Sequence, residues 1–365
     1  MSLPRTFTWL FVVVSQATDI LPAVSEDLEL EARLTPCELV EYQGYPCETT
    51  YATTEDGYIL QVDRVPYGIH ENVSKPDRGN GTSIRHPVLL VPAVFTASDL
   101  YFLNFPWQSP GFLFADNGFD VWSMNTREAK TYTSHITLSQ QDPEFWKFSF
   151  DEMGRYDVAT CIDHVLNATG ATKLTIVAFS QGVLANLVLH SVRPEYSEKV
   201  NLLVAYAPVA NITHIEPPFR WLLPIIPILE VLLYPLTEAG YLGLSSGLRE
   251  LISAACEIMG NLLCADTFTL TAFTSPEQLN QAKPPPYSLE RIRVPIALFP
   301  SPGDTVATPA DVSDLVDTLG KNVIFEHVVP VPTFHHMDFA IGYRANDILH
   351  NVAIELMRKY ALEGL

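Results

Sequence analysis

Apolar stretches of two kinds alternate through the first half of the chain. Residues 86–94 (HPVLLVPAV) and 119–125 (FDVWSMN) are short and rich in apolar side chains, which is typical of strands buried on both faces. Residues 155–167 (RYDVATCIDHVLN) instead repeat apolar side chains at helical spacing, and Gly170 follows as a stop signal. Residues 201–210 supply a further strand. Strands alternating with helices predict an α/β fold, a mostly parallel central sheet with helices on both faces.

A different pattern precedes these elements. Residues 47–67 alternate in polarity around Asp56-Gly57, a dipeptide that favours tight turns between strands. This segment is therefore predicted to form a β-hairpin.

Residues 219–267 interrupt the rhythm. Within them, residues 221–236 (WLLPIIPILEVLLYPL) are strongly apolar, but prolines and a glutamate argue against a membrane-spanning helix. Two interpretations stay open and can both hold: a buried helical subdomain, or a cap that offers apolar surface to an acyl chain or a lipid interface. We expect a core formed by residues 18–210 and 284–365, with a helical cap at 211–283.

The first seventeen residues have the layout of a secretory signal peptide. Residues 1–17 contain one early arginine, an apolar run at 7–14 and a small-x-small pattern at Ser15-Gln16-Ala17. The run is too short to span a bilayer, and the alternative is a buried N-terminal strand. A secreted or lysosomal location is therefore expected, reached through the secretory pathway. Four glycosylation sequons agree with it, at Asn72, Asn80, Asn167 and Asn211.

Composition limits the class of partner. The chain has 365 residues, of which 47% are apolar and 18% charged, enough for one large core or a core with a substantial cap. Its formal charge of −20 disfavours nucleic acids and anionic membranes, because phosphate binding needs clustered Lys and Arg. An uncharged lipid interface remains compatible with this charge.

Five cysteines fit an oxidising compartment. Cys256 and Cys264 are close enough to close a small loop, which stabilises by about 2.5 kcal/mol on loop-entropy grounds. Cys37 and Cys47 form a candidate second pair. Cys161 lies on the apolar face of a predicted helix and is expected to be a free core thiol. The odd count forbids pairing all five within the chain.

The most informative motif lies in residues 173–189 (KLTIVAFSQGVLANLVL), a predicted strand followed by Ser180 and an amphipathic helix. A serine on a tight strand-to-helix turn exposes its hydroxyl, and the N–H groups that follow point toward its ligand. Ala178 and Gly182 provide the small side chains this turn needs, although the first position is usually glycine. The alternative is an inert serine at a buried junction.

Two later segments supply the matching acid and base. Residues 294–305 (VPIALFPSPGDT) form a strand pattern that breaks into a loop carrying Asp304. Residues 322–339 (NVIFEHVVPVPTFHHMDF) form another strand, a proline-rich turn, then His335 and His336. The order Ser, Asp, His is that of the α/β-hydrolases. In such a triad the imidazole takes the hydroxyl proton and the carboxylate fixes the tautomer.

Five longer blocks accompany the Ser180 motif: residues 53–68, 109–127, 145–170, 294–312 and 336–339. Together they resemble the acid lipase family, the gastric and lysosomal lipases of animals, including arthropod members. The similarity covers most of the chain from about residue 30 onward. It implies an α/β-hydrolase fold with a shortened helical cap, because the stretch between Cys264 and Pro284 is shorter than in the family.

The resemblance implies Ser180 as nucleophile, Asp304 as orienting carboxylate and His336 as base. The family places the catalytic imidazole two residues before Asp-Phe, which selects His336; His335 is then a surface or loop-packing residue. Asp338 is expected to support this turn. The remaining candidates are expected to be structural: Asn125, Arg127, His86, His164 and His190.

The same resemblance implies an oxyanion hole made by the backbone N–H groups of Val94 and Gln181. The loop before Val94 departs from the family, with Pro92-Ala93 in place of His-Gly. Neither expected donor is a proline, so the hole can survive, but Ala93 carries a Cβ and Pro92 stiffens the approach. Phe179 likewise replaces the family's histidine before the nucleophile and should alter the packing beside the site.

The leading hypothesis is a secreted serine hydrolase that cleaves ester bonds of neutral lipids, triacylglycerol or cholesteryl ester, through an acyl-enzyme. Its expected partners are the lipid ester and a lipid-droplet or micelle interface. The triad requires no metal or organic cofactor, and the sequence has neither zinc-site spacing nor a glycine-rich phosphate loop. Two alternatives stay open: a catalytically weak lipid-binding or storage protein on a lipase fold, and an esterase for small soluble esters.

Overall fold

A computed structural model describes residues 30–31, 33–69, 85–217, 219–222 and 287–363. The chain divides into two compact units, residues 1–35 and residues 36–365. In the first unit, the described residues form short-range hydrogen bonds, for example from the N–H of Arg33 to the carbonyl of Leu30 at 3.0 Å. The second unit contains the sheet and all the elements named below.

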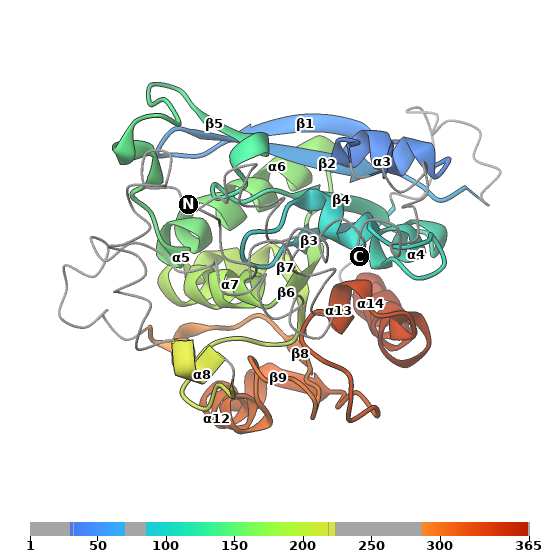
Figure 1. The fold of residues 1–365 in the computed structure, drawn as a ribbon, viewed down its shortest axis with the longest axis vertical. Helices are drawn as coiled ribbons and strands as arrows, with labels where there is room; N and C mark the ends of the chain where they lie inside the picture. Colours follow the sequence, from blue (N-terminus) through green and yellow to red (C-terminus); the bar gives the residue numbers. More distant parts are fainter. Residues whose placement is uncertain (1–29, 32, 70–84, 218, 223–286, 364–365) are drawn as a thin grey trace, which may run out of the picture. The chain divides into compact units, whose positions relative to one another are not determined.

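Within the described residues, nine strands form one sheet (Figure 1). The order is β1-β2-β4-β3-β6-β7-β8-β9, and β5 pairs with β2. Strand β2 is antiparallel to its neighbours, whereas every pair from β4 through β9 is parallel. The mostly parallel sheet is therefore confirmed. The strands are β1 (Glu48–Thr53), β2 (Tyr58–Val65), β3 (Pro87–Val91), β4 (Asp120–Met124), β5 (Thr133–His135), β6 (Leu174–Phe179), β7 (Val200–Tyr206), β8 (Ile296–Phe299) and β9 (Val323–Glu326).

The predicted hairpin is present as β1 and β2. Gly57 in its turn has φ +99°, a conformation that glycine adopts without steric cost. By contrast, β3, β4, β6, β7 and β8 are buried at every residue, as their continuous apolar sequences predict. The strand expected at residues 201–210 ends earlier, at Tyr206, because Ala207 turns the chain with φ +44°.

Helices cover both faces of the sheet (Figure 1): α6 and α7 pack on one side of the strands, and α4 and α14 on the other. The predicted helix over residues 155–167 begins as a π-helix, η4, and ends at Gly170 with φ +73°, as expected. The helices are α3 (Pro36–Tyr42), α4 (Pro110–Asp116), α5 (Phe150–Glu152), η4 (Met153–Val158), α6 (Ala159–Thr169), α7 (Gln181–Val192), α8 (Phe219–Leu222), α12 (Pro309–Leu319), α13 (Asp338–Ile341) and α14 (Asn351–Glu363). Shorter turns are the 3₁₀ segments η1 (Ser98–Phe102), η2 (Lys130–Tyr132), η3 (Pro143–Trp146), η5 (Pro194–Glu198), η9 (Leu289–Arg291) and η10 (Gly320–Asn322), and the π-helical η11 (Asn346–His350).

Two predictions about cysteine are confirmed. Cys37 and Cys47 form a disulfide with a Cα–Cα distance of 5.3 Å, which ties α3 to the start of β1. Cys161 is a buried free thiol in the core beside the sheet. Burial raises its pKa well above the ordinary value, so this thiol is unreactive. The expected pair of Cys256 and Cys264 lies outside the described residues.

Other expectations also fall outside the described residues: the signal peptide at 1–17, Asn72, Asn80 and most of the cap at 211–283. Among the described sequons, Asn167 near the end of α6 and Asn211 after β7 are exposed. None of the helices in the described part of the chain combines the length and apolar character needed to cross a bilayer.

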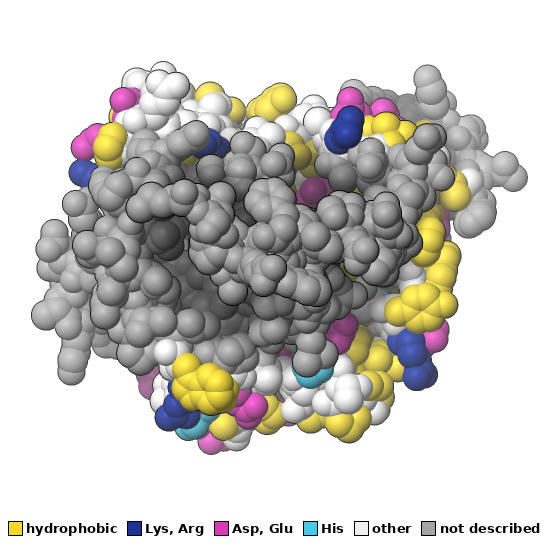
Figure 2. All heavy atoms as spheres, viewed as in Figure 1, with side chains coloured by type: hydrophobic (Ala, Val, Ile, Leu, Met, Phe, Trp, Pro, Cys, Tyr) yellow, Lys and Arg dark blue, Asp and Glu magenta, His cyan; other side chains and the backbone are white. Residues whose placement is uncertain are grey.

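On the face shown in Figure 2, Lys and Arg side chains of the described residues lie singly among acidic and hydrophobic side chains. This part of the surface presents a mixture of charges rather than a stripe of one sign.

Candidate active site

Ser180 sits on a strained turn between β6 and α7. Its backbone angles are φ 53° and ψ −115°, outside the regions that most side chains adopt, and strain of this kind concentrates at functional sites. A Cβ at Gly182 would lie 2.5 Å from the carbonyl oxygen of Val91 and 2.7 Å from that of Pro92. Glycine is thus required where α7 passes the end of β3, and the turn presents the serine at the carboxyl ends of the parallel strands.

Three side chains from distant segments meet at this edge of the sheet. The Oγ of Ser180 lies 2.7 Å from Nε2 of His336. The Nδ1 of His336 lies 2.8 Å and 3.0 Å from the two carboxylate oxygens of Asp304. All three residues are buried. A proton on Nδ1 that is donated to the carboxylate leaves Nε2 free to accept the serine hydroxyl.

The Asp304 carboxylate is held by its own loop as well as by the imidazole. Its Oδ1 accepts the N–H groups of Val306 and Ala307 at 2.8 and 2.9 Å. Burial raises the pKa of this carboxyl, but the charge and hydrogen bond of His336 and the two N–H donors outweigh burial. The net pKa of Asp304 lies below its ordinary value. The group therefore remains ionised and oriented toward the imidazole.

The neighbouring histidine points elsewhere. His335 is exposed, and its Nδ1 lies 3.0 Å from the carbonyl oxygen of Gly303. Its N–H donates to Asp338 at 2.7 Å, so Asp338 supports the turn as expected. Phe179, which the sequence singled out for its effect on packing, contacts the imidazole of His336 with ring centroids 5.1 Å apart. This aromatic contact restricts how the imidazole can move.

The loop after β3 begins with Pro92-Ala93 and then makes a tight turn. The hydroxyl of Thr96 donates to the carbonyl of Ala93 at 2.7 Å, and its N–H reaches the same oxygen at 3.3 Å. Phe95, which lies between Ala93 and Thr96, has φ +52°, in the left-handed region that is unfavourable for residues with a Cβ. Gln181, the other expected donor, is the first residue of α7, where the backbone N–H groups have no acceptor within the helix.

A buried carboxyl group that the sequence analysis did not single out lies beside this loop. The Oε1 of Glu128 accepts the N–H of Phe95 at 3.2 Å and the side-chain amide of Gln181 at 3.0 Å. The hydroxyl of Thr126 approaches the same oxygen at 3.3 Å. Burial raises the pKa of Glu128 to about 7 despite these donors. The sequence could have marked Glu128 as a candidate site residue through its position just after β4, at the carboxyl edge of the sheet.

The expected structural braces are confirmed. The guanidinium of Arg127 is buried and bonds Asp157 at 2.8 Å and Asp56 at 2.7 Å, which joins η4 to the hairpin turn. Asn125 donates to the carbonyl of Gln61 at 2.9 Å and accepts the N–H of Ser98 at 2.9 Å. These contacts fix the loop that follows β4.

The three other histidines that the sequence analysis considered belong to the scaffold, as expected. His86 lies 3.0 Å from the hydroxyl of Thr175, and His164 lies 2.9 Å from that of Thr50. His190 is completely buried on α7. Burial lowers the pKa of His86 and of His190 to about 4, so both stay neutral.

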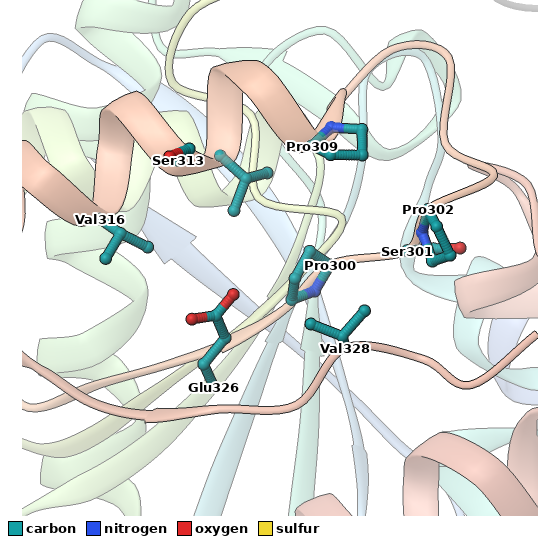
Figure 3. A pocket seen from close by; sticks show the side chains of 9 residues that line it. Pro300, Ser301, Pro302, Pro309, Ser313, Val316, Glu326 and Val328 are labelled. Atoms are coloured by element: carbon teal, nitrogen blue, oxygen red, sulfur yellow. The ribbon is translucent and has the colours of Figure 1, made fainter. Parts of the chain in front are cut away.

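One pocket of about 200 Å³ opens between α12 and β9 (Figure 3). Its walls include Ser301 and Pro302 of the Asp304 loop, Val316 of α12 and Glu326 of β9. The triad does not line this pocket, so it is a separate feature on the flank of the Asp304 loop.

His214, Asp311 and Asp314 also gather near α12, with ligand atoms within 4.8 Å of one another. The carboxylate of Asp311 is already engaged, however. It accepts the backbone N–H of His214 at 3.1 Å and lies 2.9 Å from Nδ1 of that histidine. It also accepts the Thr308 hydroxyl at 3.0 Å, so these contacts secure the start of α12.

The family model for the partial α/β-hydrolase lipase region matches residues 37–105. The gastric triacylglycerol lipase of Bos taurus is 30% identical over 90% of this chain and 92% of its own length. The human lysosomal acid lipase/cholesteryl ester hydrolase is 31% identical over the same shares, 90% and 92%. Human lipase member M is 28% identical over 97% of this chain and 94% of its own length.

Solved structures show the same fold at low sequence identity. An esterase from Thermogutta terrifontis has a TM-score of 0.52 and 14% identity, covering 86% of this chain and 99% of that chain. A naproxen esterase from Bacillus subtilis has a TM-score of 0.50 and 14% identity, covering 93% and 100%. With the observed strand order, these similarities establish the α/β-hydrolase fold.

Proposed function

Because the chain belongs to the acid lipase family and is a carboxylic ester hydrolase, we propose that Ser180 is its nucleophile, with His336 as base and Asp304 as orienting carboxylate. The observation that carries this proposal is the unbroken chain of hydrogen-bonding contacts from the serine hydroxyl through the imidazole to the carboxylate. A serine with a purely structural role at a strand-helix junction requires neither a strained backbone nor this chain of contacts.

In the first half of the reaction, the hydroxyl of Ser180 attacks the ester carbonyl while Nε2 of His336 takes its proton. Asp304 stabilises the imidazolium that forms. The tetrahedral oxyanion accepts the backbone N–H groups of Val94 and Gln181. When the intermediate collapses, the imidazolium returns the proton to the leaving alcohol, and the acyl group remains on the serine.

In the second half, water replaces the alcohol. His336 takes a proton from the water as it attacks the acyl-serine, and the same two N–H groups bind the second oxyanion. When the second intermediate collapses, the imidazolium of His336 returns this proton to the serine oxygen, the acyl–serine bond breaks and the acid product leaves. Every proton transfer in this sequence passes through His336.

The proposed substrates are esters of neutral lipids. The support comes from relatives named as a triacylglycerol lipase and a cholesteryl ester hydrolase, which match nine-tenths of this chain. The division into a core at residues 18–210 and 284–365 and a cap at 211–283 belongs to this proposal; residues 223–286 lie outside the described part of the chain. The proposed location is secreted or lysosomal, after removal of residues 1–17; the exposure of Asn167 and Asn211 supports it, because glycan acceptors must be accessible.

A fluorophosphonate probe tests the nucleophile directly. The mature protein should be labelled at Ser180 and should hydrolyse long-chain esters in micelles or emulsions. Ser180→Ala should remove labelling and lower turnover by at least about 10⁴-fold, because the triad acts as a unit. Ser313→Ala is the matched control, since this exposed serine on α12 lies outside the triad.

The same assays separate the alternatives. Labelling at Ser180 with turnover of short-chain but not long-chain esters would identify an esterase for soluble substrates. A folded protein that takes no label and turns over neither ester would be a lipid-binding protein, and the proposed mechanism would be wrong.

A further inference from the structure

The two expected oxyanion donors come from different parts of the fold. Val94 belongs to the loop after β3, whereas Gln181 begins α7. Stabilisation of an oxyanion depends on donors fixed in advance at distances of about 2.7–3.1 Å from the developing charge. The relative placement of these two segments therefore matters for the reaction.

Glu128 contacts both segments with a single oxygen. Its Oε1 accepts the backbone N–H of Phe95, the residue directly after Val94, at 3.2 Å. The same oxygen accepts the side-chain amide of Gln181 at 3.0 Å. We call these two hydrogen bonds the Glu128 clip. In the sequence, Phe95 lies 33 positions and Gln181 lies 53 positions from Glu128, so the clip connects distant segments. The side chain is buried at 5% exposure, so water competes little for these contacts.

The loop that the clip holds is strained. Phe95 has φ +52°, and Ser180 at the other side of the site has φ +53°. A left-handed backbone conformation at a residue other than glycine costs on the order of a kcal/mol, and it persists only when surrounding contacts enforce it. The hydrogen bond from Phe95 to Glu128 is such a contact, because it fixes the peptide group that follows Val94.

We propose that Glu128 is a positioning residue for ester hydrolysis, which aligns the oxyanion donors of Val94 and Gln181 by tying their two backbone segments together. This inference rests on the proposed function of Ser180. Glu128 itself does not contact the reacting atoms and exchanges no proton with the substrate.

The clip requires an acceptor oxygen rather than a negative charge. Burial raises the pKa of Glu128 to about 7, and the nearby carboxylate of Asp157 adds to the increase. At acidic pH the group is therefore neutral, and its carbonyl oxygen still accepts N–H donors. A glutamine side chain carries the same carbonyl oxygen, which makes Glu128→Gln the conservative replacement.

Substitution of Glu128, assayed at pH 5, tests the clip. Glu128→Ala should lower kcat about 10- to 100-fold, less than the roughly 10²–10³-fold cost of losing an oxyanion donor outright, with KM changed little. The rate of inactivation by a fluorophosphonate should fall in parallel. Glu128→Gln should stay within about threefold of the wild type, because its amide oxygen can rebuild the clip.

Two further variants separate positioning from general loss of stability. Gln181→Ala removes the other end of the clip but keeps its backbone N–H, and the double variant with Glu128→Ala should be no slower than Glu128→Ala alone. Asp63→Asn is the matched control. Asp63 is also buried and accepts hydrogen bonds from Thr49 and Ser98, so its substitution should lower the melting temperature and leave kcat unchanged.

The outcomes are distinguishable. A wild-type protein without Ser180-dependent turnover overturns the proposed function and this inference with it. An active wild type whose folded Glu128→Ala variant keeps its kcat overturns this inference alone, as does an equal loss in Glu128→Gln and Glu128→Ala. If Glu128→Ala does not fold, Gln181→Ala decides: a folded Gln181→Ala variant that keeps its kcat overturns the clip, and a lowered kcat with little change in KM supports it.

Discussion

At the scale of single residues, the charge on Asp304 should control the reaction through the imidazole. Asp304→Asn preserves the shape of the side chain but removes the charge, and its amide N–H₂ favours the wrong tautomer of His336. We expect kcat to fall by about 10⁴-fold with little change in KM. Steady-state kinetics on a soluble ester provide the measurement.

Asp338→Asn serves as the control for this substitution. Its carboxylate lies two residues from His336 but accepts the N–H of His335 and does not contact the catalytic imidazole. A loss of less than about tenfold is expected there, since a turn contact is worth only about 1 kcal/mol. Equal losses in the two variants would mean that Asp304 merely supports its loop.

The three residues of the proposed triad were predictable because each belongs to a local pattern. Ser180 follows a strand and precedes a helix, and Asp304 lies in the loop after a strand. The choice of His336 over His335 came from the resemblance to acid lipases, in which the catalytic imidazole lies two residues before Asp-Phe. Glu128 has no such pattern. Its importance comes from contacts with Phe95 and Gln181, and no local periodicity reports which distant residues a loop side chain will meet.

At the scale of elements, the approach of α7 to β3 depends on Gly182. A Cβ at this position would lie 2.5 Å from the carbonyl oxygen of Val91, so helix and strand must move apart to admit it. Gly182→Ala should destabilise the fold by about 1–3 kcal/mol, as overpacking does, and lower kcat because it displaces both Ser180 and the loop after β3. Urea unfolding and kinetics measure the two effects.

Gly170→Ala provides the comparison at another helix end. Gly170 has φ +73° with open space around its Cα, so alanine there incurs only the backbone cost of about 1 kcal/mol. The kcat of the Gly170→Ala variant should equal that of the wild type. The interpretation fails if Gly182→Ala behaves in the same way.

Element identities were predicted well, whereas their ends depend on backbone details that apolar patterns do not report. The strand expected to reach residue 210 stops at Tyr206, because Ala207 adopts a left-handed conformation. The helix before Gly170 starts as a π-helix. Strand β5 has only three residues, too few for an alternating pattern to be recognised.

At the scale of the whole molecule, buried histidines should make stability depend on pH. Burial lowers the pKa of His86 and His190 to about 4 and that of His350 to about 3, from an ordinary value of 6.5. In the described part of the chain, Nε2 of His190 and of His350 is buried without a hydrogen-bond partner. Protonating these rings inside the fold would bury an uncompensated charge.

The direction follows from proton binding. Between pH 6.5 and about 4 the unfolded chain protonates these histidines and the folded chain does not, so their contribution to stability is lost as the pH falls. Glu128 acts in the opposite direction. Its pKa is raised from 4.5 to about 7, so the folded state holds the extra proton over most of the same range. Other groups act in both directions: the raised pKa values of Asp99, Asp120 and Asp157 oppose the loss of stability, and the lowered pKa values of His164, Asp56 and Asp304 add to it. Because the largest changes are those of three histidines against one carboxyl, we expect a net loss of stability on acidification.

We therefore expect the melting temperature to fall as the pH is lowered from 7 to 4, with opposite changes in two variants. His190→Leu should reduce the slope, because one group that protonates only on unfolding is removed. Glu128→Gln should increase it, because the opposing group is lost. Ser313→Ala, at an exposed hydroxyl that does not titrate in this range, should leave the slope unchanged. A flat wild-type profile, or equal slopes in all the variants, would show that these buried groups do not control the response of the fold to acid.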